Sequence, residues 1–506
     1  MKRFLLLLPF ILCASTGQVK SLYNSLDPHS LTQFMAFSEL YPETEEGKKA
    51  LDHVWELLRQ NPTQKKLPQF LLPKFDIQSI VSLVTRQPFD PPVKLGKKEL
   101  EAIESLCSHF ANRKLKGSSV WTRDEVLALP TEEVDLCRGL LIEQFDESEN
   151  LEEDVRQYEA SLDLMALQIL ARLPKNVTHM EKVREINRYI FQEMQFRFPP
   201  HSLYAKDIDV YTFLPSVLDS RQGVCLGVSI LYLCLAQRLD LPLEIITPPG
   251  HIYVRYHDTE NLVNIETTAR GINPPNETYL GINTRKLQER TIKEVVGMAF
   301  FNQASVHWTR GEYETCVKLY EKAIPYFNND RLTQMFLGLN YLFVGRKKEG
   351  DDLLRPLKHH TFDYAVSEET IPTDYINGHI DVDGLKKIFL PVDETRDSIL
   401  TKQTELEKLL EKYPKFRAGV LQHAVTFLQL GRAGDALKVL TRYHELDPRD
   451  PTVEYYLSIV CAERRDFNRA WKYLQAAEEI TQARDHRPAA LRELRSKLRT
   501  LCPEPI

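Results

Sequence analysis

Two neighbouring stretches decide the fold of the central part of this chain: RQGVCLGVSILYLCLAQRL at residues 221–239 and PPGHIYVRYHDTENLVNIE at residues 248–266. Residues 226–239 are apolar on nearly every face, which predicts a buried helix. In the second stretch a Pro-Gly turn leads into an alternating strand, a polar turn at 257–260 and a second short strand at 261–266. A buried helix packed against a small antiparallel sheet places this region in the α+β class.

Cys225 is the residue at which the buried helix is expected to begin. The unpaired backbone N–H groups and the dipole at a helix N-terminus favour a thiolate, the form of cysteine that attacks carbonyl groups. Cys234 follows half a turn round the helix, at about 100° per residue, so the two cysteines cannot pair within it. We therefore expect Cys225 to be available for chemistry and Cys234 to be a small, buried apolar residue.

The hairpin that follows is expected to bring an acid to a histidine. A four-residue loop at 257–260 pairs Tyr256 with Asn261 and sets the antiparallel register. Two apolar pairs then share one face: Ile252 with Ile265, and Val254 with Val263. On the other face His251 lies opposite Glu266, and directly opposed residues have Cβ atoms about 5 Å apart. The Glu266 carboxylate is therefore predicted to reach the imidazole of His251.

Cys225, His251 and Glu266 would supply a nucleophile, a base and a residue that orients the base, the three roles of a Cys-His-acid site. His251 would take the thiol proton and return one to the leaving group, while Glu266 stabilises the imidazolium. The backbone N–H of Cys225, helped by Gln222, would stabilise the oxyanion. The residues alone leave a second interpretation open, in which a buried cysteine, a turn histidine and a strand-end glutamate only hydrogen-bond.

The motifs of the central region resemble, in order and spacing, the SirB-type branch of the transglutaminase-like family. They are INRYIF at 186–191, VLDSRQGVC at 217–225, LYLCLAQRL at 231–239 and PGH at 249–251, within a match over roughly residues 150–280. The resemblance implies a papain-like fold whose triad falls on Cys225, His251 and Glu266. Many members of this branch lack the cysteine, and the acid in the wider family is Asp rather than Glu. Several members also carry C-terminal tetratricopeptide repeats.

Repeats of this type are indicated independently, by two pairs of segments with a period of 34 residues. The first pair is Gly311, Tyr313, Cys316, Tyr320 and Ala323 with Gly345, Lys347, Gly350, Leu354 and Leu357. The second pair is Gly431, Ala436, Leu440 and Pro448 with Arg465, Phe467, Ala470, Leu474 and Ala477. Small residues at these positions let paired helices cross closely, and the alternative is a generic helical bundle.

The periodicity fails between the two pairs of repeats, at about residues 359–397. This stretch is rich in Asp, Thr and Pro, so we interpret it as an inserted loop. Within it, Asp381 to Gly384 is similar to the start of a calcium loop. The third ligand position and the distal Glu are missing, so we predict only a turn there.

The first residues have the layout of a secretory signal peptide. Met1 to Arg3 is basic, Phe4 to Leu12 is almost entirely apolar, and residues 13–17 are mostly small. A buried N-terminal strand is the alternative, and Leu12 argues against a lipid anchor on Cys13 because lipoprotein signals have a small residue at that position. No later segment reaches membrane-spanning length. We expect an exported protein that is periplasmic, bound to the cell envelope or secreted.

Composition excludes several other classes of protein. The formal net charge is -6 and basic residues are interleaved with acidic ones, so general nucleic-acid binding is not expected. The eight cysteines show no CxxC spacing, so we predict no zinc site. We also expect no other metal and no cofactor. A disulfide-dense framework is excluded, whereas one or two isolated bridges are not. Asn176 and Asn276 begin N-x-T sequons, which matter only in a eukaryotic secretory pathway.

The chain is therefore predicted to be mostly helical, with a papain-like or transglutaminase-like central domain and a C-terminal helical repeat region. The N-terminal part is expected to form amphipathic helices at 47–59, 97–112 and 132–147, followed by one at 151–173. We predict a signal peptide (1–17), a helical N-terminal region (18–148), a transglutaminase-like domain (149–290), repeats (291–357), an insertion (358–398) and further repeats (399–506).

These features predict thiol-dependent acyl transfer or hydrolysis of peptide or isopeptide amides through a Cys225 thioester. Protease, amidase and transglutaminase share this half-reaction, and the triad does not choose among them. The repeats are expected to bind a protein or peptide partner. The competing function is a catalytically silent scaffold for protein–protein interaction at the cell envelope.

Overall fold

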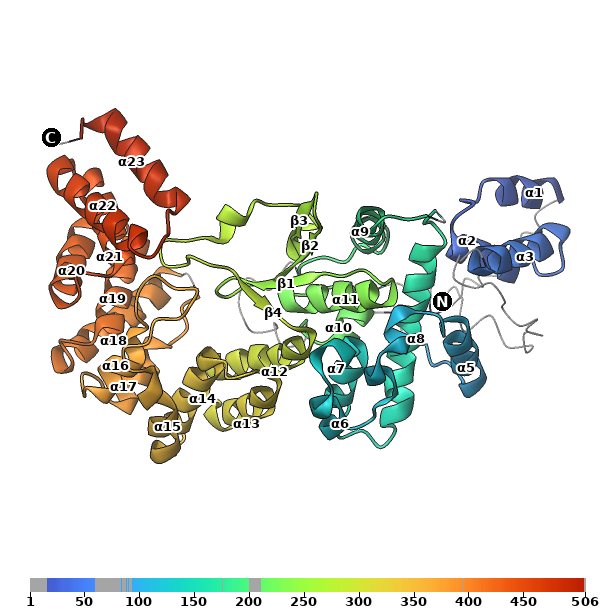
Figure 1. The fold of residues 1–506 in the computed structure, drawn as a ribbon, viewed down its shortest axis with the longest axis horizontal. Coiled ribbons are helices and arrows are strands. Elements are labelled where there is room, and N and C mark those ends of the chain that lie inside the picture. Colours follow the sequence, from blue (N-terminus) through green and yellow to red (C-terminus); the bar gives the residue numbers. More distant parts are fainter. Residues whose placement is uncertain are drawn as a thin grey trace, which may run out of the picture.

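The computed structural model describes residues 16–59, 83, 88, 90, 93–174, 176–199, 211–393 and 395–504. In this part of the chain helices predominate around a single four-stranded antiparallel sheet, which confirms the α+β class (Figure 1). The predicted signal peptide falls outside the described residues except for Thr16 and Gly17, which begin helix α1. No helix in the described ranges is long and apolar enough to cross a membrane.

The sheet and one buried helix form the centre of the molecule. The described strands are β1 (Glu244–Thr247), β2 (Tyr253–His257), β3 (Leu262–Ile265) and β4 (Gln288–Arg290), in the order β3-β2-β1-β4. Helix α11 (Cys225–Arg238) packs against β2. All its residues from 226 to 236 are buried, which confirms the predicted buried helix.

The predicted hairpin register is wrong by two residues. Val254 pairs with Ile265 and Tyr256 with Val263, so the turn lies one residue later than predicted. The side chain of Asp258 explains the difference: its Oδ1 accepts hydrogen bonds from the backbone N–H groups of residues 260 and 261, at 2.8 and 2.7 Å. Side chains alternate with period two, so a two-residue shift leaves every residue on the face predicted for it.

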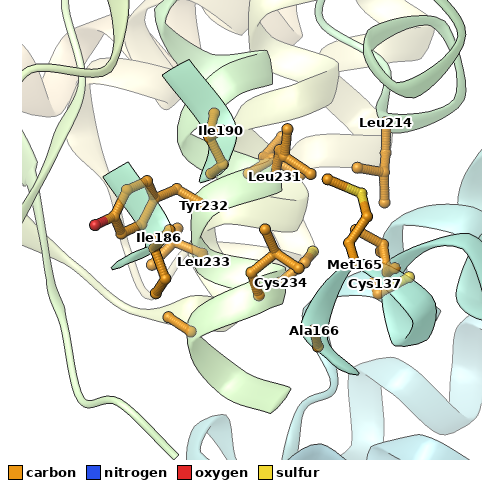
Figure 2. Close-up of a cluster of buried hydrophobic side chains, with 14 of the residues drawn as sticks. Cys137, Met165, Ala166, Ile186, Ile190, Leu214, Leu231, Tyr232, Leu233 and Cys234 are labelled. Carbon is orange, nitrogen blue, oxygen red and sulfur yellow. The ribbon is translucent and has the colours of Figure 1, made fainter. Parts of the chain in front are cut away.

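The N-terminal helices share one hydrophobic core with α11. They are α1 (Thr16–Asn24), α2 (Leu31–Leu40), α3 (Glu45–Arg59), α5 (Lys97–Leu106), α6 (Arg123–Ala128), α7 (Leu136–Gln144), α8 (Leu151–Leu170), α9 (His179–Asn187) and α10 (Leu214–Ser220). The helix predicted over 97–112 ends at Leu106, and the one predicted over 132–147 is a 3₁₀ turn at Thr131–Glu133 followed by α7. Figure 2 shows Cys234 of α11 among side chains from α7, α8 and α9, fully buried as expected.

Buried charges also join α11 to the N-terminal helices. Arg238, at the end of α11, donates from Nε to Asp163 on α8 at 2.7 Å, and both side chains are fully buried. Arg113 donates to the second oxygen of Asp163, also at 2.7 Å. Arg138 on α7 holds Glu159 on α8 through two hydrogen bonds of 2.6 and 2.7 Å. Each buried charge therefore has an opposite partner, which offsets the cost of taking it out of water.

The C-terminal half consists of paired helices. The pairs are α12 (Ile292–Thr309) with α13 (Tyr313–Ala323), α14 (Arg331–Phe343) with α15 (Lys347–Leu354), α19 (Arg417–Gln429) with α20 (Ala433–Leu446), and α21 (Pro451–Glu463) with α22 (Phe467–Gln482). Helix α18 (Arg396–Lys412) precedes the third pair, and α23 (Ala489–Leu501) follows the last. Three of the pairs turn at a glycine with positive φ, namely Gly311, Gly345 and Gly431, and Arg465 takes the same left-handed conformation in the fourth.

The stretch interpreted as an inserted loop contains two short helices, which corrects that prediction. They are α16 (Thr370–Ile376) and α17 (Val382–Ile388), and both pack against the repeats. Asp381, predicted to lie in a turn, is instead the N-cap of α17 and accepts a hydrogen bond from the backbone N–H of Gly384 at 2.8 Å. The capping hydrogen bond of Asp381 therefore begins a helix here.

The described cysteines are all free thiols, so no bridge joins any two of them. Cys107, Cys137, Cys234, Cys316 and Cys461 are buried, whereas Cys225 and Cys502 are half-buried. The described residues contain no group of three or more side chains suited to hold a metal ion.

Candidate functional site

Cys225 is the first residue of α11 and is half-buried. The backbone N–H groups of the first turn point toward the N-terminus of the helix, where Cys225 lies. Val224, the N-cap residue, has no polar side chain to accept hydrogen bonds from them. The chain passes closely on both sides of Cys225. A Cβ added to Gly227 would lie 2.3 Å from the carbonyl oxygen of Tyr211, and one added to Gly223 would lie 2.7 Å from Val228. Residues 223 and 227 are therefore glycines because a larger side chain at either position would collide with neighbouring atoms.

His251 follows a tight turn whose backbone N–H donates to the carbonyl of Pro248 at 3.0 Å. Gly250 has φ +73° and provides the left-handed position of that turn. Nε2 of His251 lies 2.7 Å from Oε2 of Glu266. Burial lowers the pKa of His251, but interactions with Cys225 and Glu266 outweigh it and raise the pKa to about 10. The imidazole is therefore held protonated at neutral pH.

Glu266 lies directly after β3, where it caps the short 3₁₀ helix Thr267–Ala269. Its Oε1 accepts hydrogen bonds from the hydroxyl and the backbone N–H of Thr268, at 2.7 and 3.2 Å, and Tyr279 donates its hydroxyl to Oε2. Burial raises the pKa of Glu266, but the donors His251, Tyr279 and Thr268 outweigh it and lower the pKa to about 2. The carboxylate therefore stays charged beside the imidazole, and the predicted contact between His251 and Glu266 is confirmed.

Thr267 fixes the position of the acid relative to the cysteine. Its hydroxyl lies 3.0 Å from the hydroxyl of Ser229, on the first turns of α11, and 3.5 Å from the backbone carbonyl of Cys225. Because Thr267 is the next residue after Glu266, the helix that begins at Cys225 and the loop that carries the carboxylate are fastened together at a buried polar contact.

Residues 156–300 match the transglutaminase-like superfamily. The matched segment contains the complete sheet described above, α11 and the three side chains Cys225, His251 and Glu266. The chain therefore has a transglutaminase-like domain, followed by a helical repeat region.

The chain is also similar to solved structures over part of its length. The chain is similar to a structure titled "MamA MSR-1 C2", with 18% identity and a TM-score of 0.19 over 37% of this chain and 97% of that one. It is also similar to TTC0263, described as a thermophilic TPR protein in Thermus thermophilus. That match has 16% identity and a TM-score of 0.21 over 40% of this chain and 97% of that one. No curated protein matches the chain.

Gln222 lies in the short loop between α10 and α11 of the transglutaminase-like domain. Its backbone N–H donates to the hydroxyl of Ser220 at 3.1 Å, and it pairs with Arg197 in an isolated parallel bridge. Gln222 is buried three residues before Cys225. The oxyanion role expected of its side chain stays a prediction.

Two tyrosines of the site were not predicted from the sequence. The Tyr279 ring stacks on the rings of both His251 and Tyr253, with centroid distances of 5.7 and 4.7 Å and interplanar angles of 21°. Tyr253 could have been recognised, because it alternates with His251 on one face of the strand. Tyr279 carries no such signal, since it belongs to a 3₁₀ helix, Asn276–Tyr279, outside any regular pattern.

Proposed function

We propose that this chain is an exported protein of the SirB-type branch whose transglutaminase-like domain carries out thiol-dependent acyl transfer or hydrolysis on peptide or isopeptide amides. The observation that carries the proposal is the His251–Glu266 hydrogen bond of 2.7 Å together with Cys225 at the start of a buried helix, where Cys225 interacts with His251 and raises its pKa. Export rests on the basic and apolar pattern of residues 1–17.

The proposed reaction begins with attack of the Cys225 sulfur on the amide carbonyl carbon. The C–N bond breaks as protonated His251 gives its proton to the departing nitrogen, which leaves a thioester on Cys225. Water or an amine, losing its proton to His251, then attacks the thioester, and Cys225 leaves as a thiolate. Glu266 keeps the imidazole ring oriented through Nε2, which leaves Nδ1 as the nitrogen for the proposed proton transfers. The backbone N–H of Cys225, with Gln222 beside it, is the proposed oxyanion donor.

Glu266 in place of the usual Asp is compatible with this proposal. The side chain is one methylene longer, yet its Oε2 lies 2.7 Å from Nε2 of His251. The carboxylate is also held by Thr268 and Tyr279, so the extra methylene does not leave it free to rotate.

The rate of iodoacetamide alkylation of Cys225, followed against pH by mass spectrometry, tests the proposal. We expect Cys225 to react rapidly already at neutral pH, because the imidazolium of His251 stabilises the thiolate. Half-buried Cys502 is an internal reference for access of the reagent. A midpoint near ~8.5 at Cys225 would sink the enzymatic function.

The second candidate is a scaffold in which the fold supports a partner-binding surface on the repeats. A hollow of about 420 Å³ lies between α21 and α23, lined by apolar residues including Tyr455, Ile459 and Leu501. It is bordered by Glu463 and Lys497, so a peptide or helix with one apolar face and charges of both signs would fit it.

Two sets of variants in the native host separate the functions. Cys225→Ala removes the nucleophile, and Tyr455→Ala together with Leu501→Ala alters the hollow on the repeats. If the cysteine variant keeps every phenotype of the unaltered gene while the repeat variant loses them, the scaffold function stands. The opposite result supports the enzyme.

A further inference from the structure

The chain between β3 and β4 leaves the sheet and crosses to the C-terminal helices before it returns (Figure 1). Ile282, near the far end of this segment, is buried in the same hydrophobic cluster as residues of α20, α21 and α22. A side chain of the transglutaminase-like domain is therefore part of the core of the repeats.

Hydrogen bonds fasten the same segment on both sides. Oδ1 of Asn283 accepts from the backbone N–H groups of residues 366 and 367, at 3.0 and 2.7 Å, and from the Ser367 hydroxyl at 2.9 Å. The Nε2 atom of His486, beyond α22, lies 2.8 Å from the carbonyl oxygen of Gly281. A backbone bridge joins Thr284 to Ala365. The segment 281–285 is thus held by residues 365–367, in the stretch between the two groups of helix pairs, and by His486 after α22.

The near end of the segment is the 3₁₀ helix Asn276–Tyr279, which is fastened to the site. Asn276 accepts hydrogen bonds from Arg255 at 3.0 Å and from Asn264 at 2.7 Å. At its other end Tyr279 donates to Glu266 and stacks on His251. Only one residue separates Tyr279 from Gly281, whose carbonyl bonds to the repeats, and two residue steps span at most about 7 Å.

We propose that Tyr279 is a positioning residue for the His251–Glu266 pair, and that the docked repeats hold it in place through residues 281–283. The consequence for catalysis rests on the proposed function. The Tyr279 hydroxyl fixes the Glu266 oxygen that faces His251, and the ring limits tilting of the imidazole. The repeats are therefore a support of the site as well as a candidate surface for a partner.

Tyr279→Phe in the full chain tests the direct part of the proposal, because it keeps the ring and removes only the hydroxyl. We expect the pH midpoint of Cys225 alkylation to rise by about one pH unit, because the Glu266 oxygen that faces His251 is then no longer fixed in place and the imidazolium loses an aligned partner. Tyr253→Phe is the matched control. It removes a hydroxyl from the same stack, but one that accepts from Arg255 at 3.0 Å rather than binding Glu266. An unchanged midpoint in Tyr279→Phe, or an equal shift in both variants, overturns the proposal.

Asn283→Ala tests the link to the repeats, with Thr284→Ala as its matched control because the bridge of Thr284 is made by backbone atoms. We expect Asn283→Ala to move the alkylation midpoint in the same direction as Tyr279→Phe, at an unchanged melting temperature of the protein. If Asn283→Ala unfolds the protein, Ile282→Val provides a milder change at the same contact. A folded variant with the unaltered profile contradicts the link.

Failure of the proposed function is distinguishable from failure of this inference. If Cys225 of the unaltered protein alkylates with a midpoint near ~8.5, the enzymatic function fails. The positioning role is then decided by NMR titration of the His251 imidazole. It stands if Tyr279→Phe changes that titration and Tyr253→Phe does not, and it falls if neither variant changes it.

Discussion

Glu266 shows how much one residue depends on its surroundings. Its two oxygens accept from His251, Thr268 and Tyr279, and its backbone N–H and carbonyl bond to residues 272 and 271 at 3.0 and 2.9 Å. A carboxylate with this many donors keeps its charge in a buried position. The same arrangement would serve a catalytic pair or a structural ion pair, so reactivity of Cys225 is what separates the two.

The pKa values of the pair predict where it stabilises the fold. The pKa of Glu266 is lowered from 4.5 to about 2, so its contribution is complete above pH 4.5 and is lost as the pH falls toward 2. The pKa of His251 is raised from 6.5 to about 10, so its contribution is complete below pH 6.5 and is lost as the pH rises toward 10. We expect the difference in free energy of unfolding between the unaltered protein and Glu266→Gln to be largest between pH 4.5 and 6.5.

Urea unfolding of both proteins at a series of pH values measures this difference. Thr268→Val is a control that removes one donor to Glu266 and leaves the His251 contact in place. A difference that stays constant from about pH 4 to about pH 9 contradicts the pKa shifts on which the prediction rests.

At the scale of elements, the repeats depend on close approach of paired helices. Gly338 on α14 faces Gly350 on α15, and a Cβ added to Gly350 would lie 2.8 Å from the carbonyl oxygen of Gly338 and 2.6 Å from Leu342. This is the physical reason for the small residues that recur with the 34-residue period. The turn between the helices adds a second requirement, positive φ, which Arg465 meets without being glycine.

Gly350→Ala should therefore destabilise the repeats by about 1–3 kcal/mol, the usual cost of overpacking a tight contact. Gly434→Ala is the matched control in α20, because its added Cβ would meet only the end of the flexible Arg464 side chain, at 3.0 Å. There the better helix propensity of alanine should leave stability unchanged or raise it by up to ~1 kcal/mol. Thermal unfolding of the two variants checks the prediction, and equal melting temperatures would count against close crossing.

At the scale of the whole molecule, the transglutaminase-like domain is not self-contained. Its hydrophobic core includes buried residues of α2, α3, α5 and α7 in addition to the matched segment. The buried carboxylates Glu159 and Asp163 lie within residues 156–300, whereas their partners Arg138 and Arg113 lie before it. The N-terminal helices therefore buttress the fold.

A fragment of residues 156–300 is predicted not to fold. It would leave Glu159 without Arg138, and removing one partner of a buried pair costs about 3–5 kcal/mol, a large share of the ~5–15 kcal/mol by which a domain is stable. A fragment of residues 16–327, which retains the whole core cluster, should unfold cooperatively. Circular dichroism melting compares the two, and a cooperative transition in the shorter fragment would refute this account of the core.

Local patterns in the sequence were sufficient for several features of the fold and the site. An apolar run of helical length predicts α11 and places Cys225 at its start, and alternation puts His251 on the face that meets Glu266. The 34-residue period predicts the helix pairs. These features could be predicted because each depends on residues close together in the chain, whose spacing repeats with the helix or strand itself.

The tertiary structure alone decided the rest. The hairpin register depended on hydrogen bonds made by Asp258. One partner of Glu266 is a tyrosine thirteen residues away, and no periodic pattern in the sequence links the two. Arg238, which in the sequence only interrupts an apolar run, is fully buried because Asp163, 75 residues earlier, neutralises it. Such partners are set by the path of the whole chain. Periodicity therefore determined which faces are buried, whereas long-range packing determined which polar groups meet there.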